Sequence, residues 1–427
     1  MEAFNTHINL PCIPYAFTTI SSASCAFPGS ITGTVTPWMD TRIWSRLPHR
    51  LIDRIIAFLP PAAFFRSRSV CKRWYALIFS TQFLEMYLQV SPIRHCFIFF
   101  KLKSLKSHIY KNNNAPYNID QNRINCEGYM FDPQTITWHC LTFPLIPPGY
   151  SPSSSSGGLI CWVSDEAGPK TIFLSNPLFG SLTPLPSTLR PRLFPSVGLT
   201  VSNSSIDIVL AGDDMISPYA VKNLTTESFH IDSSGFYSIW GTTSSLPRLC
   251  SLESGQMINL HTKFYCMNYS PFSVLTYDIS SNLWCKIQAP MKRYLRSPNL
   301  VVINNKLVLV AAVEKSKLNV PKSLRLWALQ SCGAAWAEID RMPLQLYAQF
   351  EAEENGRGFN CVGNGEYVAV VIRGSGKAVL FDMGMKRWQW IPACPYENGG
   401  GELHGFAYDP KLATPVTGLL DQLTVPF

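Results

Sequence analysis

Long apolar runs are missing from this sequence: no stretch approaches the roughly 20 consecutive apolar residues that a helix needs to cross a bilayer. The first residues, Met1–Phe4, lack the basic charge that begins a secretory signal peptide. Thirteen cysteines are scattered from Cys12 to Cys394 without a C-x-x-C pair, so the sequence indicates neither a disulfide framework nor a zinc site. We therefore expect an intracellular chain with reduced thiols, no bound metal and no membrane segment.

Catalytic motifs are missing as well. The eight histidines are isolated, with neither H-x-x-H nor H-E-x-x-H spacing. The segment Gly374–Ala378 superficially resembles a phosphate-binding loop, but Val371 stands where the first glycine is required and Ala378 replaces the Mg²⁺-binding hydroxyl. We predict a β-turn there, no catalytic residue and no cofactor, with an enzyme as the rival class.

Positive charge is concentrated in one short segment. The whole chain carries a formal net charge of +8, and Trp44–Phe79 alone contains seven Arg or Lys against one acid, Asp53. A basic module of this size favours an acidic partner or nucleic acid, without choosing between them. Residues 1–40 are instead rich in Ser, Thr, Pro and Asn and show no periodicity, which predicts a disordered tail.

The basic segment has the periodicity of helices. Five apolar residues place a broad stripe on one helix that Pro60-Pro61 must end: Leu51, Ile52, Ile55, Ile56 and Leu59. A second helical stretch puts Val70, Trp74, Leu77 and Ile78 on one face, and a further short helix is expected around Phe83–Leu88. About 40 residues bury too little surface to fold robustly alone, so a partner surface is expected. The alternative is a helical cap packed on the rest of the chain.

These residues carry a resemblance. The pattern L-P-x-x-L-I-x-x-I-I-x-x-L-P, followed by the segment Arg66–Trp74, resembles the F-box along its full length. Membership of that family implies a face that binds a Skp1-type adaptor, which in turn binds a cullin scaffold. By resemblance the Skp1-binding residues would be Leu47, Pro48, Leu51, Ile52, Ile55, Leu59, Val70, Cys71 and Trp74.

The remainder of the chain is rich in predicted strands and contains a repeat. Each unit has an apolar strand, an Asp or Asn turn, and then an aromatic residue; Trp284, Trp336 and Trp388 follow one another at intervals of 52 residues. Periods of this size are typical of propeller blades, since a four-stranded blade buries both faces only between neighbours. Counting a weak unit around Phe229, we predict about six blades. Gly157-Gly158 resembles the double glycine of kelch repeats, which suggests a kelch-type propeller.

We therefore expect a mixed, mainly β protein with three parts. Residues 1–40 form the tail, residues 41–90 the F-box and a linker helix, and residues 91–427 the kelch-type propeller. The segment Lys101–Asn114 has four lysines in its first eleven positions and ends in an Asn run, which predicts a protruding basic loop. Such a loop can contact DNA phosphates or simply be a solvated loop on a strand edge; the DNA-contact candidates are Lys101, Lys103, Lys106 and Lys111.

Several longer words of sequence resemble one family of plant floral regulators, the Unusual Floral Organs or Fimbriata family. They include the segments Trp38–Asp40, Ala211–Asp214, Lys263–Ser270 and Gly401–Phe406. The resemblance implies a nuclear and cytoplasmic subunit of a Skp1–cullin–F-box (SCF) ubiquitin ligase. It further implies a transcriptional cofactor that works with the transcription factor Leafy in floral meristems and in petal and stamen identity.

Two functions remain open at this stage. A degradation receptor needs the Skp1 contact, whereas a DNA-associated cofactor, largely independent of ubiquitination, needs the propeller and its basic loop on promoter DNA. In both cases the chain is a non-catalytic adaptor that recognises its partner through propeller loops.

Overall fold

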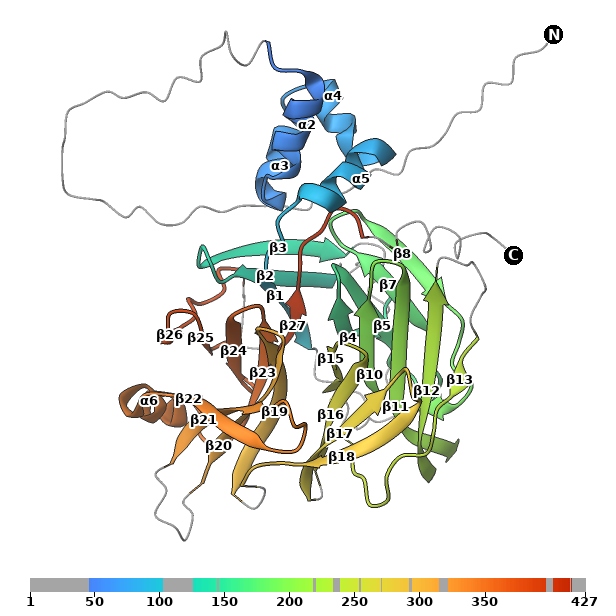
Figure 1. Cartoon of the computed structure of the whole chain (residues 1–427), viewed down its shortest axis with the longest axis vertical. Coiled ribbons are helices and arrows are strands. Elements are labelled where there is room, and N and C mark those ends of the chain that lie inside the picture. Colours follow the sequence, from blue (N-terminus) through green and yellow to red (C-terminus); the bar gives the residue numbers. More distant parts are fainter. Residues whose placement is uncertain are drawn as a thin grey trace, which may run out of the picture.

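In the computed structural model, six sheets form a ring and a group of helices packs against one side of it, next to strands β1–β8 (residues 96–185; Figure 1). The structure describes residues 46–102, 126–143, 146–217, 220–232, 239–252, 255–269, 271–291, 294–314, 322–396, 402–414 and 416. The predicted tail, residues 1–40, lies outside the described residues.

The helical part begins at His49 and ends at Val90. It comprises α2 (His49–Ala57), α3 (Pro61–Ser67), α4 (Lys72–Ala76), the 3₁₀ helix η1 (Leu77–Phe79) and α5 (Thr81–Val90). Helix α2 ends before Pro60, as predicted. A further helix, α3, which was not predicted from the sequence, begins at Pro61. Proline is favourable at the first position of a helix, because the N–H that it lacks would have no partner within the helix there. The Cys71 sulfur accepts a hydrogen bond from the Trp74 N–H and so caps α4.

Six sheets form the blades of a β-propeller, which confirms the predicted fold class. Blades 1 and 2 consist of β27 (Glu402–Tyr408), β1 (Cys96–Leu102), β2 (Cys126–Asp132) and β3 (Thr137–Phe143), then β4 (Tyr150–Ser156), β5 (Leu159–Ser164), β7 (Ile172–Asn176) and β8 (Ser181–Leu185). Blade 3 consists of β14 (Gly255–Gln256), β10 (Ser196–Val201), β11 (Ser205–Ser217), β12 (Ala220–Asp232) and β13 (Gly241–Thr242).

Blades 4 to 6 are regular four-stranded sheets. They consist of β15 (Ile258–Leu260), β16 (Lys263–Tyr269), β17 (Phe272–Asp278) and β18 (Leu283–Gln288); β19 (Leu295–Ile303), β20 (Lys306–Val313), β21 (Ser323–Leu329) and β22 (Trp336–Arg341); and β23 (Phe359–Asn364), β24 (Tyr367–Ile372), β25 (Ala378–Asp382) and β26 (Arg387–Trp390). Two short strands, β6 (Gly168–Pro169) and β9 (Pro191–Arg192), pair outside the blades.

The repeated tryptophans lie on the outermost strands and tie each blade to the one before it. Trp284 and Trp388 stand opposite the aromatic residue next to the end of the neighbouring strand, in the pairs Tyr277–Trp284 and Phe381–Trp388. The indole N–H groups of the repeated tryptophans donate hydrogen bonds to the preceding blade. Across three blade boundaries Trp138 donates to the Pro392 carbonyl (3.0 Å), Trp336 to the Gln288 carbonyl (2.8 Å) and Trp388 to Asp340 Oδ1 (3.1 Å). The 52-residue period therefore reflects one recurring inter-blade contact.

The turn between the first two strands of a blade explains why the double glycine is not repeated. Gly157 and Gly158 have φ of 58° and 87°. Asn304 and Asn305 occupy the same turn in blade 5 with φ of 46° and 55°, and asparagine tolerates this left-handed conformation better than most residues. The kelch-type description stays a prediction. The segment from Gly374 is a turn, as predicted, closed by the Ser375 N–H on the Ile372 carbonyl at 3.2 Å.

The ring is closed by the two ends of the propeller. Strand β27 pairs with β1, from Cys96 opposite Tyr408 to Leu102 opposite Glu402. At this closure the His95 Nδ1 lies 3.0 Å from Asn364 Oδ1 and 3.3 Å from Asp409 Oδ1. Residues from the first strand's start, the last strand's end and blade 6 therefore meet in one polar cluster.

This cluster makes the stability of the ring depend on pH. The hydrogen bond from His95 to the Asp409 carboxylate raises the pKa of His95, with Asn364 acting in the same direction, while burial and Lys411 oppose it. A raised folded-state pKa means that the stabilisation is fully present below about pH 6.5 and is lost as the pH rises through the folded-state value.

We therefore expect the melting temperature of His95→Asn to fall further below that of the unmodified chain at about pH 5.5 than at about pH 8.5. Thermal unfolding followed by circular dichroism at both pH values measures the two gaps. In an Asp409→Asn background the dependence on pH should largely vanish. Equal gaps at both pH values would contradict a charged His95 in the folded chain.

Blade 3 departs most from the common pattern. Its strands β11 and β12 extend past Ala211, the last β11 residue that pairs with β10. Arg192 supports the extension, because its Nη1 donates to the carbonyls of Gly212 (2.8 Å) and Thr225 (3.0 Å). The same guanidinium contacts the Glu227 carboxylate, and both side chains are fully buried. A completely buried ion pair therefore holds the long hairpin to the propeller.

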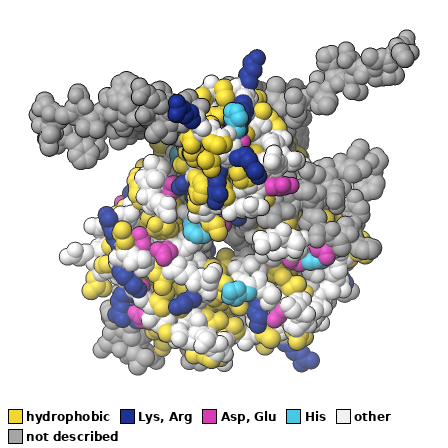
Figure 2. Space-filling model, turned by 45° about the horizontal axis from the view of Figure 1, so that its top comes forward, with side chains coloured by type: hydrophobic (Ala, Val, Ile, Leu, Met, Phe, Trp, Pro, Cys, Tyr) yellow, Lys and Arg dark blue, Asp and Glu magenta, His cyan; other side chains and the backbone are white. Residues whose placement is uncertain are grey.

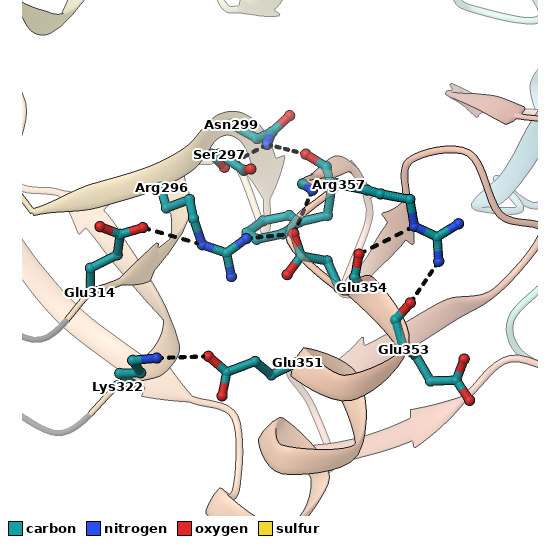
Figure 3. Close-up of polar contacts among 11 residues, drawn as sticks. Arg296, Ser297, Asn299, Glu314, Lys322, Glu351, Glu353, Glu354 and Arg357 are labelled. Atoms are coloured by element: carbon teal, nitrogen blue, oxygen red, sulfur yellow. Dashed lines mark hydrogen bonds and ion pairs between the residues drawn. The ribbon is translucent and has the colours of Figure 1, made fainter.

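Between blades 5 and 6 the chain forms α6 (Leu344–Glu354), which packs on the outside of the ring. Figure 3 shows the charged residues around its end. The buried Glu354 carboxylate accepts hydrogen bonds from Arg296 and from the Gly358 N–H, and Lys322 binds Glu351 nearer the solvent at 3.1 Å. Glu351 and Glu354 are thus each paired with a basic side chain, Lys322 and Arg296 respectively. These ion pairs hold α6 against the neighbouring strands.

Candidate protein-docking site

Helix α2 presents apolar side chains on two adjacent faces, one turned toward the core and one toward solvent. Ile56 is only 2% exposed, and Ile52 and Leu59 pack against the same inner core. Leu51, Ile55 and Phe58 lie outside, 47%, 41% and 48% exposed. The five predicted residues do form one broad stripe, since their positions around the helix span about 140°. The structure divides this stripe along its length into a half that packs on the core and a half that is exposed.

The exposed large apolar side chains between His49 and Phe79 form what we call the outer apolar set. Its members share high exposure on a module that is otherwise well packed: Leu51, Ile55, Phe58, Val70, Tyr75 and Phe79. Figure 2 shows hydrophobic side chains gathered over these helices, with basic side chains among them. Large apolar groups left in water at this density mark a surface that binds another protein.

The nine predicted Skp1-binding residues divide between the two faces. Exposed to solvent are Pro48, Leu51, Ile55, Val70 and Cys71, and Leu47 is half-buried. Ile52, Leu59 and Trp74 instead pack on the inner core of the chain. The sequence reasoning missed Phe58, Tyr75 and Phe79, although Phe58 lies at i+3 from Ile55 and so on the same face of α2.

The basic residues of the module also divide into two groups. Arg73 binds both carboxylate oxygens of Asp53, at 2.5 and 2.6 Å, and so joins α4 to α2. Arg68 is buried, with its guanidinium 4.5 Å from the centre of the Tyr75 ring. The other basic side chains of the described module are exposed to solvent: Arg46, Arg50, Arg54, Arg66 and Lys72. The outer apolar set is therefore accompanied by positive charge.

The inner face of the module is fused to the propeller. One apolar core runs without a break from the helices into blades 1 and 2 and includes Phe64, Phe83, Phe100, Trp162 and Phe406. The alternative of a helical cap packed on the same chain is thus observed for the inner face. It does not cover the outer apolar set, which remains available to a partner.

Of the four predicted DNA-contact lysines, only Lys101 lies among the described residues. Lys101 is a residue of strand β1, opposite Leu403, and is half-buried, so its placement in a loop is wrong. The hydrophobic strand Cys96–Leu102 extends through it because β27 pairs with it up to Glu402. Lys103, Lys106 and Lys111 lie outside the described residues, and their contact with DNA stays a prediction.

The part of the chain that the structure describes contains no metal-type cluster and no membrane-type helix. There, no three His, Cys, Asp or Glu side chains are grouped so that they could hold a metal ion. No helix among the same residues is long and apolar enough to cross a membrane.

A helical module with an exposed apolar surface, fused to a six-bladed propeller, is the architecture expected of an F-box adaptor with a propeller recognition domain. The F-box domain model matches residues 44–85. The chain is 58% identical to the protein UNUSUAL FLORAL ORGANS of Arabidopsis thaliana over 99% of this chain and 97% of that protein. It is 41% identical to ABERRANT PANICLE ORGANIZATION 1 of Oryza sativa subsp. japonica, over 90% of this chain and 92% of that protein. The chain belongs to the UNUSUAL FLORAL ORGANS family of F-box proteins.

A more distant relative bears on the partner. The Arabidopsis thaliana protein named SKP1-interacting partner 15 is 24% identical over 86% of this chain and 97% of that protein. The name of this relative states a SKP1 interaction. The family is one of non-catalytic F-box adaptors, and its relatives in Arabidopsis and rice carry names of floral and panicle organisation.

Proposed function

We propose that this chain is the substrate-recognition adaptor of an SCF ubiquitin ligase. The helical module binds a Skp1-type adaptor through the outer apolar set, and the adaptor joins the chain to a cullin. The observation that carries this proposal is the exposure of Leu51, Ile55 and Phe58 on a helix whose adjacent apolar face packs on the inner core. The transfer of ubiquitin is chemistry of the other subunits.

The physical basis of this binding is burial of the outer apolar set. Fully burying a Leu, Ile or Phe side chain contributes about 1.5–3 kcal/mol, so half-exposed members contribute roughly 1 kcal/mol each. The exposed arginines, including Arg50 and Arg54 on α2, favour an acidic partner surface and accelerate association at low salt.

The propeller recognises the target. Propellers place recognition residues on the loops that join their strands, and the rigid blades hold those loops in fixed positions. For this chain we propose a Leafy-type transcription factor as the partner, in the nucleus and cytoplasm of floral meristem cells, with effects on petal and stamen identity. This assignment is supported by membership of the UNUSUAL FLORAL ORGANS family.

A second function is favoured by the lysine-rich segment Lys101–Lys111. Four lysines in eleven positions can neutralise DNA phosphates beside a bound transcription factor. The chain would then be a DNA-associated transcriptional cofactor, largely independent of ubiquitination. Because Lys101 is a half-buried strand residue, the phosphate contacts are assigned to Lys103, Lys106 and Lys111.

Replacing Lys103, Lys106 and Lys111 by alanine is expected to weaken the complex of this chain, a Leafy-type factor and promoter DNA. Each lost phosphate contact should also lower the slope of log K against log salt by about 0.9. A gel-shift titration across a salt series measures both effects, with Lys101→Ala as the matched single variant that should change the slope little. An unchanged slope in the triple variant refutes the phosphate contacts, and absence of any ternary complex returns the balance to a degradation receptor.

A further inference from the structure

The segment that follows the last strand, β27, packs against the rest of the protein. After β27 the segment Asp409–Thr414, here called the C-terminal clamp, runs between the helical module and blade 2. Leu412, Ala413 and Thr414 are buried. The Leu412 N–H points to the hydroxyl of Tyr87 in α5, at 3.4 Å. The clamp therefore contacts the last helix of the F-box module directly.

Blade 2 holds the clamp from the other side through Asn176. The Asn176 Oδ1 accepts hydrogen bonds from the N–H groups of Leu178 and Phe179, which fixes the side chain in its own turn. Its Nδ2 donates to the carbonyls of Lys411 (3.1 Å) and Leu412 (3.5 Å). Leu412 thus contacts the propeller through its carbonyl and the helical module through its N–H.

A glycine makes room for this segment. A Cβ atom on Gly158 would lie 3.1 Å from the Asp409 carbonyl oxygen and 3.1 Å from the Lys411 Cβ. Gly158 also has a φ of 87°, so both the turn and the close passage of the clamp require glycine there. The Asp409 side chain is tied to Asn364 and His95 at the ring closure. The clamp is therefore fixed at its start by blade 6 and along its length by blade 2.

We propose that the C-terminal clamp sets the orientation of the F-box module on the propeller, with Tyr87 and Asn176 as its positioning residues. The module is joined to the propeller through the short segment between Val90 and Cys96 and through the shared apolar core. An apolar core alone is non-directional. The hydrogen bonds of the clamp fix the direction, so the Skp1-binding surface and the propeller loops keep one mutual geometry. The consequence for a ligase rests on the proposed function; the orientation itself does not.

The variant that tests this is Tyr87→Phe combined with Asn176→Asp. The first change removes the acceptor of the Leu412 N–H and keeps the ring in the core. The second keeps the Oδ1 acceptor and places a carboxylate oxygen against two carbonyl oxygens. Asn268→Asp is the matched control, because Asn268 is a similarly buried asparagine near the end of strand β16, and its Nδ2 donates to the Pro271 carbonyl and to Ser273 in blade 4.

The distance distribution between α5 and the propeller is the readout. Spin labels on p-acetylphenylalanine at the exposed positions Gln82 and Lys306 report it by pulsed electron resonance in the full-length chain. We expect one narrow distribution in the unmodified chain and in Asn268→Asp, and a broad one in the double variant. The Leu412 amide should exchange with solvent about five- to ten-fold faster in the double variant only.

Narrow distributions in all three proteins would overturn the proposal, and so would equal broadening in the double variant and the control. If the double variant does not fold, Tyr87→Phe alone is used with the same two criteria. Skp1 binding by the unmodified chain is measured in parallel. Its absence would refute the proposed adaptor function while leaving the distance result a valid test of the clamp.

Discussion

Replacing Leu51 and Ile55 by glutamate is expected to abolish binding of a Skp1-type adaptor while the chain stays folded. Both side chains are more than two-fifths exposed, so two charges there cost the free chain little. In a complex they would be buried without partners, which adds to the lost apolar contact. We expect an affinity at least about 100-fold lower, measured by isothermal titration with purified adaptor.

Two controls make this result specific. Met385→Glu changes an apolar side chain on the propeller that is more exposed than Leu51 or Ile55, and it should leave the affinity unchanged. Ile56→Glu places the charge on the buried face of the same helix and should unfold the module. Wild-type affinity in the Leu51 and Ile55 variant would rule out this face as the docking site. Lost adaptor binding with retained transcriptional activity would instead favour the cofactor function.

The second large effect is expected for Arg192→Met. This change leaves the Glu227 carboxylate buried without its cation and removes the donor to the Gly212 and Thr225 carbonyls. Breaking a fully buried ion pair from one side typically costs about 3–5 kcal/mol. Urea unfolding should therefore show a large loss of stability, together with faster amide exchange along β11 and β12.

Rescue by a second change separates charge from packing. When Glu227→Met is added, no uncompensated charge remains, so the double variant should be more stable than Arg192→Met alone. Lys322→Met breaks the exposed Lys322–Glu351 pair and should change stability by less than about 1 kcal/mol. A double variant no more stable than Arg192→Met would show that the guanidinium acts mainly through the two carbonyls.

The propeller could be predicted because a tryptophan recurs at the same place in several blades, where its indole N–H binds the preceding blade. Trp336 and Trp388 each bind the preceding blade, so their spacing equals the length of a blade. Blade 3 gave a weak signal, since its long hairpin and the Trp240 that precedes β13 depart from this spacing. The pairing of β27 with β1 joins residues about 300 positions apart, and no local pattern encodes it.

The docking site could be predicted only in part. Helical periodicity correctly gave the apolar residues of α2, but the two halves of one apolar stripe are equally hydrophobic and do not show which one faces the propeller. The Pro60-Pro61 pair was interpreted only as the end of a helix, although Pro61 also begins α3. The C-terminal clamp could not be predicted from the sequence, because its contacts with Tyr87 and Asn176 join residues that come together only when the ring closes.

The most direct test of the whole account is native mass spectrometry of the full-length chain mixed with a purified Skp1-type adaptor and a Leafy-type factor. Because the outer apolar set lies on the helices and recognition is assigned to the propeller, the account predicts one species that contains all three proteins, lost when Leu51 and Ile55 are glutamate. A chain that binds the transcription factor but never the adaptor, under conditions in which another F-box protein binds it, would contradict the central claim.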